Sequence, residues 1–194
     1  MYAVIEGIDT AGKSTQLELL KEKLPYAIFT KEPGGTPLGI KLRNMALDGE
    51  AKSKIAEMFL FMADRAEHIE EVIKKNKNDT IISDRSMISG IAYASALSID
   101  ELINLNLIAT NNTLPTHVIL LELTPHELKF RLSQKENDSI ELRGIDYLIN
   151  IQNRMKETIK RLNINHIIID ASLKIEEIEK KIEDFINGEK KKKK

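Results

Sequence analysis

The chain has 194 residues, with 29 basic and 30 acidic side chains and a formal net charge of −1. This balance gives no electrostatic reason to expect nucleic acid as a partner. A chain without cysteine has no disulfides, thiol catalysis or cysteine-bound zinc, and no apolar run approaches the ~18 residues of a membrane span. An apolar strand pattern already begins at residue 2, so we expect no secretory leader, no membrane partner and a cytoplasmic location.

Short apolar runs alternate with helix-patterned segments along the chain. Strands are predicted at 2–6, 27–30, 80–83, 117–123 and 166–170. Helices are predicted at about 13–24, 38–48, 53–75, 86–97, 99–111, 125–133, 143–162 and 174–187. The last two strand patterns are continuous apolar runs, typical of strands buried on both faces of a parallel sheet. The alternation predicts one α/β domain over 1–188, with a five-stranded parallel sheet and helices on both faces.

The segment between the first strand and the first helix fits G-x-x-x-x-G-K-[ST], the phosphate-binding P-loop, and so predicts a P-loop NTPase fold. Its glycines let successive backbone N–H groups face an anion, and the helix start adds partial positive charge. Lys13 is expected to reach the β- and γ-phosphates, and Ser14 to ligate Mg²⁺. The residues expected to bind ATP are Gly7, Asp9, Thr10, Ala11, Gly12, Lys13, Ser14 and Thr15.

Charged residues also follow the third predicted strand, at the sheet edge where ligands of open α/β sheets bind. Asp84 is expected to hold Mg²⁺ or its waters, as a Walker B aspartate does. Arg85 comes next and suits phosphate binding, as do Arg43 and Arg65 on neighbouring helices. A surface arginine paired with an acid is the alternative for each. The strand-end position of Arg85 favours the functional interpretation.

Two residues leave alternatives open. Asp9 is a carboxylate inside an anion-binding loop, so it faces either a hydroxyl of a second substrate or its own backbone as a cap. Phe61 precedes Arg65 by four residues on one helix face, which would suit stacking on a base, but its apolar surroundings favour core packing. The histidines, at 68, 117, 126 and 166, have no metal-ligand spacing and are assigned no chemistry.

Four segments occur in order along the chain: EGIDTAGKST at 6–15, TKEPGGT at 30–36, LFMADR at 60–65, and SDRS at 83–86 with Ser89 and Tyr93 beyond it. Together they resemble the bacterial type of thymidylate kinase, a nucleoside-monophosphate kinase with a P-loop. The resemblance implies transfer of the γ-phosphate of ATP to dTMP, with Mg²⁺, giving ADP and dTDP for dTTP biosynthesis. It also implies that dTMP is bound by Asp9, Glu32, Pro33, Arg43, Phe61, Arg65, Arg85, Ser89 and Tyr93.

The resemblance implies separate roles for these residues. Asp9 would bind the 3′-hydroxyl, Phe61 would stack on thymine, Arg65 would contact the base and phosphate region, Arg43 and Arg85 would hold the monophosphate, and Tyr93 would crowd the 2′ position. A homodimer is implied as well. The helix predicted at 53–75 supports it with more apolar residues than one core-facing stripe needs, namely Ile55, Met58, Phe59, Leu60, Phe61 and Met62.

Two polar segments follow the ends of predicted helices. We interpret 133–142 as a short mobile lid and 189–194 as a disordered basic tail. The lid contains Asp138-Ser139-Ile140-Glu141 where the bacterial family usually has an arginine, and the P-loop has no basic residue at 9–11. Ala94 stands where a glutamine often follows the family's tyrosine.

Another cation is therefore expected to stabilise the charge that develops on the transferred phosphoryl group. The candidates are Arg131 first, Lys135 second and Arg143 third. The predicted catalytic residues are Lys13, Arg85, Arg131 and Lys135.

The main alternative function is a deoxynucleoside kinase or another P-loop phosphotransferase. A neutral hydroxyl nucleophile would then need a carboxylate base, and Glu32 could serve. The segment EPGGT at 32–36 argues against this alternative.

Overall fold

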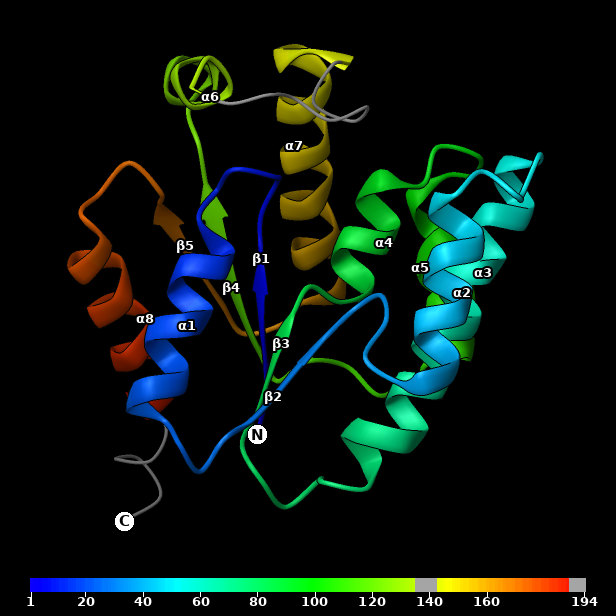
Figure 1. Cartoon of the computed structure of the whole chain (residues 1–194), viewed down its shortest axis with the longest axis horizontal. Helices are drawn as coiled ribbons and strands as arrows, with labels where there is room; N and C mark the ends of the chain where they lie inside the picture. Colours follow the sequence, from blue (N-terminus) through cyan, green and yellow to red (C-terminus); the bar gives the residue numbers. More distant parts are fainter. Residues whose placement is uncertain (135–142, 189–194) are drawn as a thin grey trace.

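The computed structural model describes residues 1–134 and 143–188, which form a parallel sheet between two layers of helices (Figure 1). The strands are β1 (Tyr2–Glu6), β2 (Ile28–Lys31), β3 (Ile81–Asp84), β4 (His117–Glu122) and β5 (His166–Asp170), in the sheet order β2-β3-β1-β4-β5. The helices are α1 (Lys13–Lys23), α2 (Pro37–Leu47), α3 (Lys54–His68), α4 (Met87–Tyr93), α5 (Ile99–Ala109), α6 (Pro125–Leu132), α7 (Ile145–Leu162) and α8 (Ile175–Gly188). A π-helical segment, η1 (Ile69–Lys74), continues α3. The predicted α/β fold class is confirmed.

The helices divide between the two faces of the sheet. Helices α1 and α8 pack together on one face, and α4 and α7 pack together on the other (Figure 1). In the second layer α3 contacts α2, α4 and α5. Because every strand pairing is parallel, the loops after the strands meet at one edge of the sheet.

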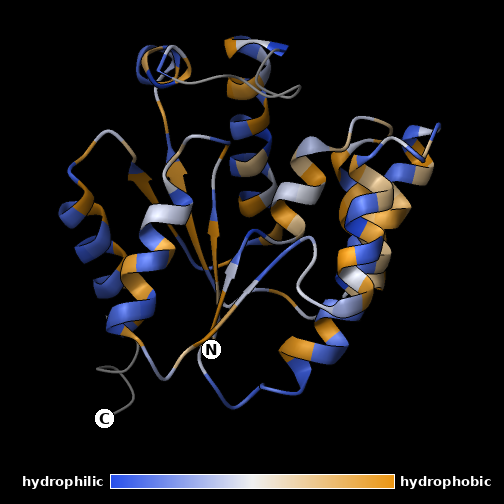
Figure 2. Ribbon diagram, viewed as in Figure 1, coloured by the Kyte–Doolittle hydropathy of each residue, from blue (hydrophilic) through white to orange (hydrophobic). Residues whose placement is uncertain are grey.

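The core is built on the central strands. The segments Ala3–Ile5 of β1 and Val118–Leu121 of β4 are fully buried, and Figure 2 shows both strands in the hydrophobic colour. Burial on both faces is thus confirmed for β4, but the same prediction is wrong for β5. There His166 is exposed and Ile168 is 41% exposed. The reason is that β5 pairs with β4 alone and forms the edge of the sheet.

Helix α4 is shorter than the helix predicted at 86–97. Arg154 on α7 supplies hydrogen-bond donors at its end: Nε donates to the carbonyl oxygen of Ala92 at 2.9 Å. Nη2 of Arg154 donates to the carbonyl oxygens of Ile91 at 3.1 Å and Ala94 at 2.8 Å. The guanidinium thus replaces backbone donors that further helical turns would have supplied, and this allows the helix to stop.

Two predicted segments lie wholly or mostly outside the described residues. Of the lid predicted at 133–142, the structure describes only Ser133 and Gln134, and none of the tail predicted at 189–194 is described. Over the ranges 1–134 and 143–188, no helix combines the length and apolar character that crossing a membrane requires.

Candidate functional site

The P-loop connects β1 to α1 at the carboxyl edge of the sheet. Gly7 has φ of 151°, and an added Cβ would lie 2.9 Å from the carbonyl oxygen of Leu121, so glycine is required there. Gly12 has φ of 94° and precedes α1 without a side-chain cap. Within the described residues no side chain caps the N-terminus of α1, which suits binding of an anion there.

Lys13 is folded back over the P-loop. It is 7% exposed, and Nζ donates to the carbonyl oxygens of Gly7 and Ile8, each at 3.0 Å. Burial and, second, the charge of Arg85 lower the pKa of Lys13 to about 8. A polyphosphate in this loop would supply the negative charge that favours the protonated ammonium.

Ser14 and Asp84 line one hollow of about 350 Å³ at the carboxyl ends of β2 and β3. Oδ1 of Asp84 is buried and has no hydrogen-bond partner among the described residues. No cluster of three or more His, Cys, Asp or Glu side chains able to hold a metal occurs in 1–134 and 143–188. One hydroxyl and one carboxylate, completed by phosphate and water oxygens, is a usual donor set for Mg²⁺ at nucleotide sites, so the residues present fit this ion.

Arg85 connects the P-loop to α4. It follows β3 with a positive φ of 68°, a conformation that non-glycine residues adopt mostly at constrained, often functional positions. Nη1 donates to the carbonyl oxygen of Gly7 at 3.1 Å and to Oγ of Ser89 at 3.0 Å, while Nη2 forms an ion pair with Asp9. The guanidinium lies 5.6 Å from the centre of the Tyr93 ring. The structure thus gathers Asp9, Arg85, Ser89 and Tyr93 into one group, the Arg85 cluster, and turns the Asp9 carboxylate toward this arginine.

A buried glutamate that the sequence analysis missed supports the Arg85 cluster. Glu6 is fully buried and accepts hydrogen bonds from Oγ of Ser86 at 2.7 Å and Oγ of Ser89 at 2.5 Å. Burial raises the pKa of Glu6, and the serine hydrogen bonds and the charge of Arg85 oppose that rise. The available signal in the sequence is an acid that ends an apolar strand directly before the P-loop.

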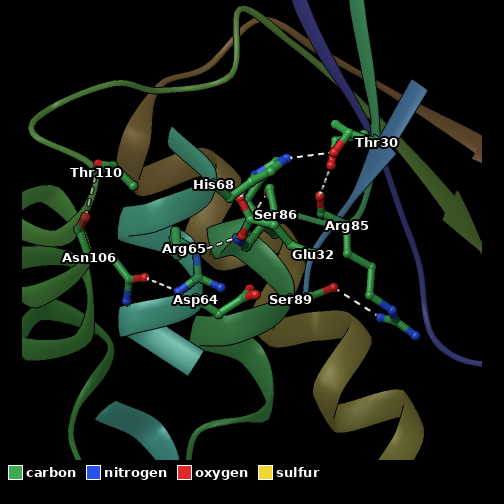
Figure 3. A network of polar contacts seen from close by, with 12 residues as sticks. Thr30, Glu32, Asp64, Arg65, His68, Arg85, Ser86, Ser89, Asn106 and Thr110 are labelled. Carbon is green, nitrogen blue, oxygen red and sulfur yellow. Dashed lines mark hydrogen bonds and ion pairs between the residues drawn. The ribbon is translucent and has the colours of Figure 1, made fainter. Parts of the chain in front are cut away.

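Arg65 belongs to a second group, which Figure 3 shows close to Ser86, Ser89 and Arg85. Its Nε donates to Oε2 of Glu32 at 2.8 Å, and Nδ1 of His68 lies 2.8 Å from Oε1 of the same carboxylate. Burial raises the pKa of Glu32, but the charge of Arg65 and the hydrogen bond from His68 outweigh it, so the pKa is below its usual value. His68, which the sequence analysis assigned no chemistry, is thus part of a polar network.

Three further predicted dTMP ligands lie on or near α2 and α3. Phe61 is half-buried, whereas Met58 and Met62 of the same helix belong to the buried core. Pro33 follows a cis peptide bond, and Arg43 is exposed. The aliphatic part of Arg43 crosses the loop after β2, where a Cβ on Gly34 would lie 3.0 Å from its Cδ.

Arg131 on α6 reaches the P-loop. Nη1 donates to the carbonyl oxygen of Thr10 at 2.9 Å, Nη2 to that of Ala171 at 2.5 Å, and Nε to Glu127 at 2.7 Å. The structure therefore brings the first-ranked cation to the donor side of the site. Arg143 instead donates to the hydroxyl of Tyr147 at 3.0 Å. The second-ranked Lys135 lies outside the described residues.

Comparison with known proteins agrees with the motifs. The profile of the thymidylate kinase family matches residues 5–182. The chain belongs to the thymidylate kinase family. A thymidylate kinase of Aliarcobacter butzleri is 80% identical over 187 residues, covering 96% of this chain and 99% of the relative. One from Wolinella succinogenes is 55% identical, covering 94% and 96%.

A solved structure supports the same fold. The thymidylate kinase of Ehrlichia chaffeensis aligns with a TM-score of 0.75, covering 96% of this chain and 98% of that one, at 22% sequence identity. At this identity the likeness concerns the fold, and the predicted P-loop NTPase architecture is confirmed by it. Family membership makes the chain an ATP-dependent nucleoside-monophosphate kinase by class.

Proposed function

We propose that this chain transfers the γ-phosphate of ATP to dTMP and releases ADP and dTDP. The observation that carries the proposal is the position of Arg85. One of its nitrogens donates to both the P-loop carbonyl of Gly7 and the hydroxyl of Ser89, so the predicted donor and acceptor sites share this residue. A cation between two polyanionic substrates is what their direct reaction needs.

The acceptor in this reaction is a phosphate oxygen, which is already ionised at neutral pH. It needs no general base, and the main obstacle is repulsion between two polyanions. Lys13, Arg85 and Arg131 would supply positive charge around the transferred group, with Lys135 as the second lid candidate. The P-loop from Gly7 to Thr15 would hold the phosphates of ATP through backbone N–H groups.

Ser14 and Asp84 would hold Mg²⁺, since they share a hollow and Asp84 has an oxygen free of protein partners among the described residues. Bound there, Mg²⁺ would neutralise charge on the β- and γ-phosphate oxygens. Asp84 lies at the end of β3, so the carboxylate is fixed by the sheet.

We propose the residues that bind dTMP from family membership, and their positions in the structure support the proposal. Asp9 would bind the 3′-hydroxyl of dTMP, and Tyr93 would restrict the 2′ position; both already contact Arg85. Half-buried Phe61 would stack on thymine. The remaining ligands would be Glu32, Pro33, Arg43, Arg65, Arg85 and Ser89, with Glu32 acting through Arg65.

The deoxynucleoside kinase alternative is not favoured. It needs an accessible carboxylate base with a raised pKa. Glu32 is 4% exposed, both of its oxygens are occupied by Arg65 and His68, and its pKa is lowered.

We propose also that the enzyme is a cytoplasmic homodimer whose interface uses exposed side chains of α2 and α3. Two of the apolar residues counted for an interface in the predicted helix at 53–75, Met58 and Met62, are buried in the core of the chain. They cannot contact a second copy. On α2 and α3 the exposed large apolar side chains are Leu38, Ile40, Met45, Leu47, Ile55 and Phe59. Six exposed large apolar residues on two packed helices suit an interface with a second copy.

Sedimentation of the wild type and the Phe59→Glu variant tests the homodimer. We expect a wild-type dimer that dissociates in the variant. A wild type that stays monomeric at every concentration contradicts the proposal.

The test of the main proposal is ADP formation with dTMP, with thymidine and with no acceptor, each with and without Mg²⁺. We expect turnover that depends on both dTMP and Mg²⁺. Preference for thymidine would favour the deoxynucleoside kinase, and equal turnover without any acceptor would refute both kinases.

A further inference from the structure

Five polar side chains form a continuous chain of hydrogen bonds from half-buried Thr30 on β2 to buried Asn106 on α5, the Arg65 network (Figure 3). Oγ1 of Thr30 lies 2.7 Å from Nε2 of His68, whose Nδ1 lies 2.8 Å from Oε1 of Glu32. Oε2 of Glu32 accepts from Nε of Arg65 at 2.8 Å, and Nη1 of Arg65 donates to Oδ1 of Asn106 at 2.6 Å. From His68 to Asn106, no member is more than 5% exposed.

The hydrogen-bond directions in this network follow from chemistry. Glu32 is ionised and can only accept, so His68 donates to it from Nδ1. Nε2 of His68 faces the hydroxyl of Thr30, which can donate or accept. On the other side, Nδ2 of Asn106 donates to the carbonyl oxygen of Leu102 at 2.7 Å, which leaves the amide oxygen to face Arg65. A second hydrogen bond thus fixes each of these two side chains: Asn106 bonds Leu102, and His68 bonds Thr30.

Arg65 is therefore fixed through two of its three nitrogens. Nε is bound by Glu32 and Nη1 by Asn106, while Nη2 forms no hydrogen bond with another residue in 1–134 or 143–188. A guanidinium clamped on two sides keeps its plane, so the third nitrogen is presented in one direction.

Two glycines make room for the network. A Cβ on Gly90 would lie 2.5 Å from Nη2 of Arg65, and a Cβ on Gly35 would lie 2.5 Å from the carbonyl oxygen of Lys31 and 2.8 Å from Cδ2 of His68. Neither glycine has a positive φ, so close approach and not backbone conformation explains its presence. Glycine inside a helix lowers the stability of that helix, so Gly90 makes space for Arg65 while destabilising α4.

Stability alone does not account for this arrangement, because a buried ion pair commonly gains little over apolar packing of the same volume. We propose that His68 and Asn106 are positioning residues that hold Arg65 in one orientation, His68 through Glu32 and Asn106 directly, so that Nη2 is presented to the acceptor nucleotide. This inference rests on the proposed function, because it takes Arg65 as a ligand of dTMP.

Steady-state kinetics of matched variants test the proposal. His68→Leu removes the donor to Glu32, whereas His68→Asn keeps a nitrogen donor where Nδ1 stood. We expect His68→Leu to raise the KM for dTMP by about ten- to a hundredfold, the value of a hydrogen bond to a charged group, with the KM for ATP within about twofold. His68→Asn should recover most of the loss. Gly90→Ala should also raise the KM for dTMP, since it displaces Nη2 without changing His68.

The control variant is Gln152→Leu on α7. Gln152 is also buried and bonds the backbone N–H and carbonyl of Leu123, each at 2.9 Å, so its loss reports a purely structural effect. This variant should lower the free energy of unfolding and leave the KM for dTMP unchanged. If Gln152→Leu and His68→Leu raise the KM for dTMP equally, or if His68→Leu leaves it within about twofold of wild type, the positioning role is overturned.

A measurement without nucleotide separates this inference from the proposed function. The Nε–H of a buried, hydrogen-bonded arginine exchanges slowly and gives its own signal in ¹⁵N-resolved NMR, and Arg65→Lys assigns it. We expect the Arg65 signal to shift or broaden in His68→Leu and to persist in His68→Asn. A signal that His68→Leu leaves unchanged overturns the positioning role even if dTMP is phosphorylated. If the wild type does not phosphorylate dTMP, the proposed function is refuted. The NMR result then still decides whether His68 orients Arg65.

Discussion

Replacing Lys13 with methionine should abolish catalysis and yet stabilise the fold. Methionine keeps the shape of the side chain in a site that is 7% exposed and removes its charge. Burial lowers the pKa of Lys13 from 10.5 to about 8. At neutral pH the folded state must hold a proton that its environment disfavours, which costs about 3 kcal/mol.

The lost hydrogen bonds offset only part of this gain. The carbonyl oxygen of Gly7 keeps a donor from Arg85 at 3.1 Å, and that of Ile8 keeps the N–H of Ala11 at 3.2 Å. Neither acceptor is left without a partner, so the loss is about 1 kcal/mol. We expect Lys13→Met to raise the free energy of unfolding by about 2 kcal/mol at pH 7.

The pH dependence gives the effect a distinct sign. Unfolded chains keep the Lys13 proton up to its ordinary pKa of 10.5, whereas the folded state releases it near pH 8. The penalty is therefore complete below pH 8 and disappears as pH rises toward 10.5, so wild type gains stability over that range. Urea unfolding of both proteins should show their difference shrinking by about 2 kcal/mol between pH 7 and pH 9.5.

Lys21→Met is the matched control, since Lys21 lies on the same helix with a side chain 47% exposed. Its effect should stay within about 0.5 kcal/mol at both pH values. A Lys13→Met protein less stable than wild type at pH 7, or a difference that does not change with pH, would show that burial of the Lys13 charge does not destabilise the fold.

Three more outcomes are expected. Arg154→Met should lower the free energy of unfolding in urea by about 2–4 kcal/mol, because three carbonyls at the end of α4 lose their donor; unchanged unfolding would contradict this. Asp84→Asn should raise the Mg²⁺ concentration for half-maximal activity at least about tenfold, as loss of a carboxylate ligand does, and an unshifted Mg²⁺ titration would remove Asp84 from the metal site. Arg131→Ala should lower turnover at saturating ATP and dTMP by about a hundredfold or more, while Arg143→Ala, whose guanidinium contacts Tyr147, should keep it; equal turnover in both variants would exclude Arg131 as the additional cation.

The parts of the site carried by local sequence were predictable. The P-loop motif places Gly7, Gly12 and Lys13 within a few residues of each other, and strand and helix patterns on either side fix its setting. The place of Asp84 followed from the end of an apolar strand. The parallel sheet was predictable as well, because the alternation of strand and helix patterns along the whole chain indicates it.

The contacts between distant segments were not predictable from pattern. Arg154 reaches α4 across about sixty residues of chain, from 60 to 63 positions away, and periodicity contains no such pairing. Glu32 and His68 are 36 positions apart, so the histidine had no visible partner in the sequence. Burial of β5 was overpredicted because strand order, too, depends on contacts between distant segments. The apolar sequence of β5 is like that of a central strand, but β5 lies at the edge of the sheet.

Direct transfer between ATP and dTMP is tested by following the phosphoryl group itself. ATP labelled in the γ-phosphate is mixed with the enzyme, Mg²⁺ and dTMP, and the products are separated at early times. Because Arg85 joins the P-loop to the acceptor side, we expect label in dTDP, formed as fast as ADP, with little free phosphate. Label released as inorganic phosphate at the same rate with and without dTMP would contradict direct transfer between the two sites.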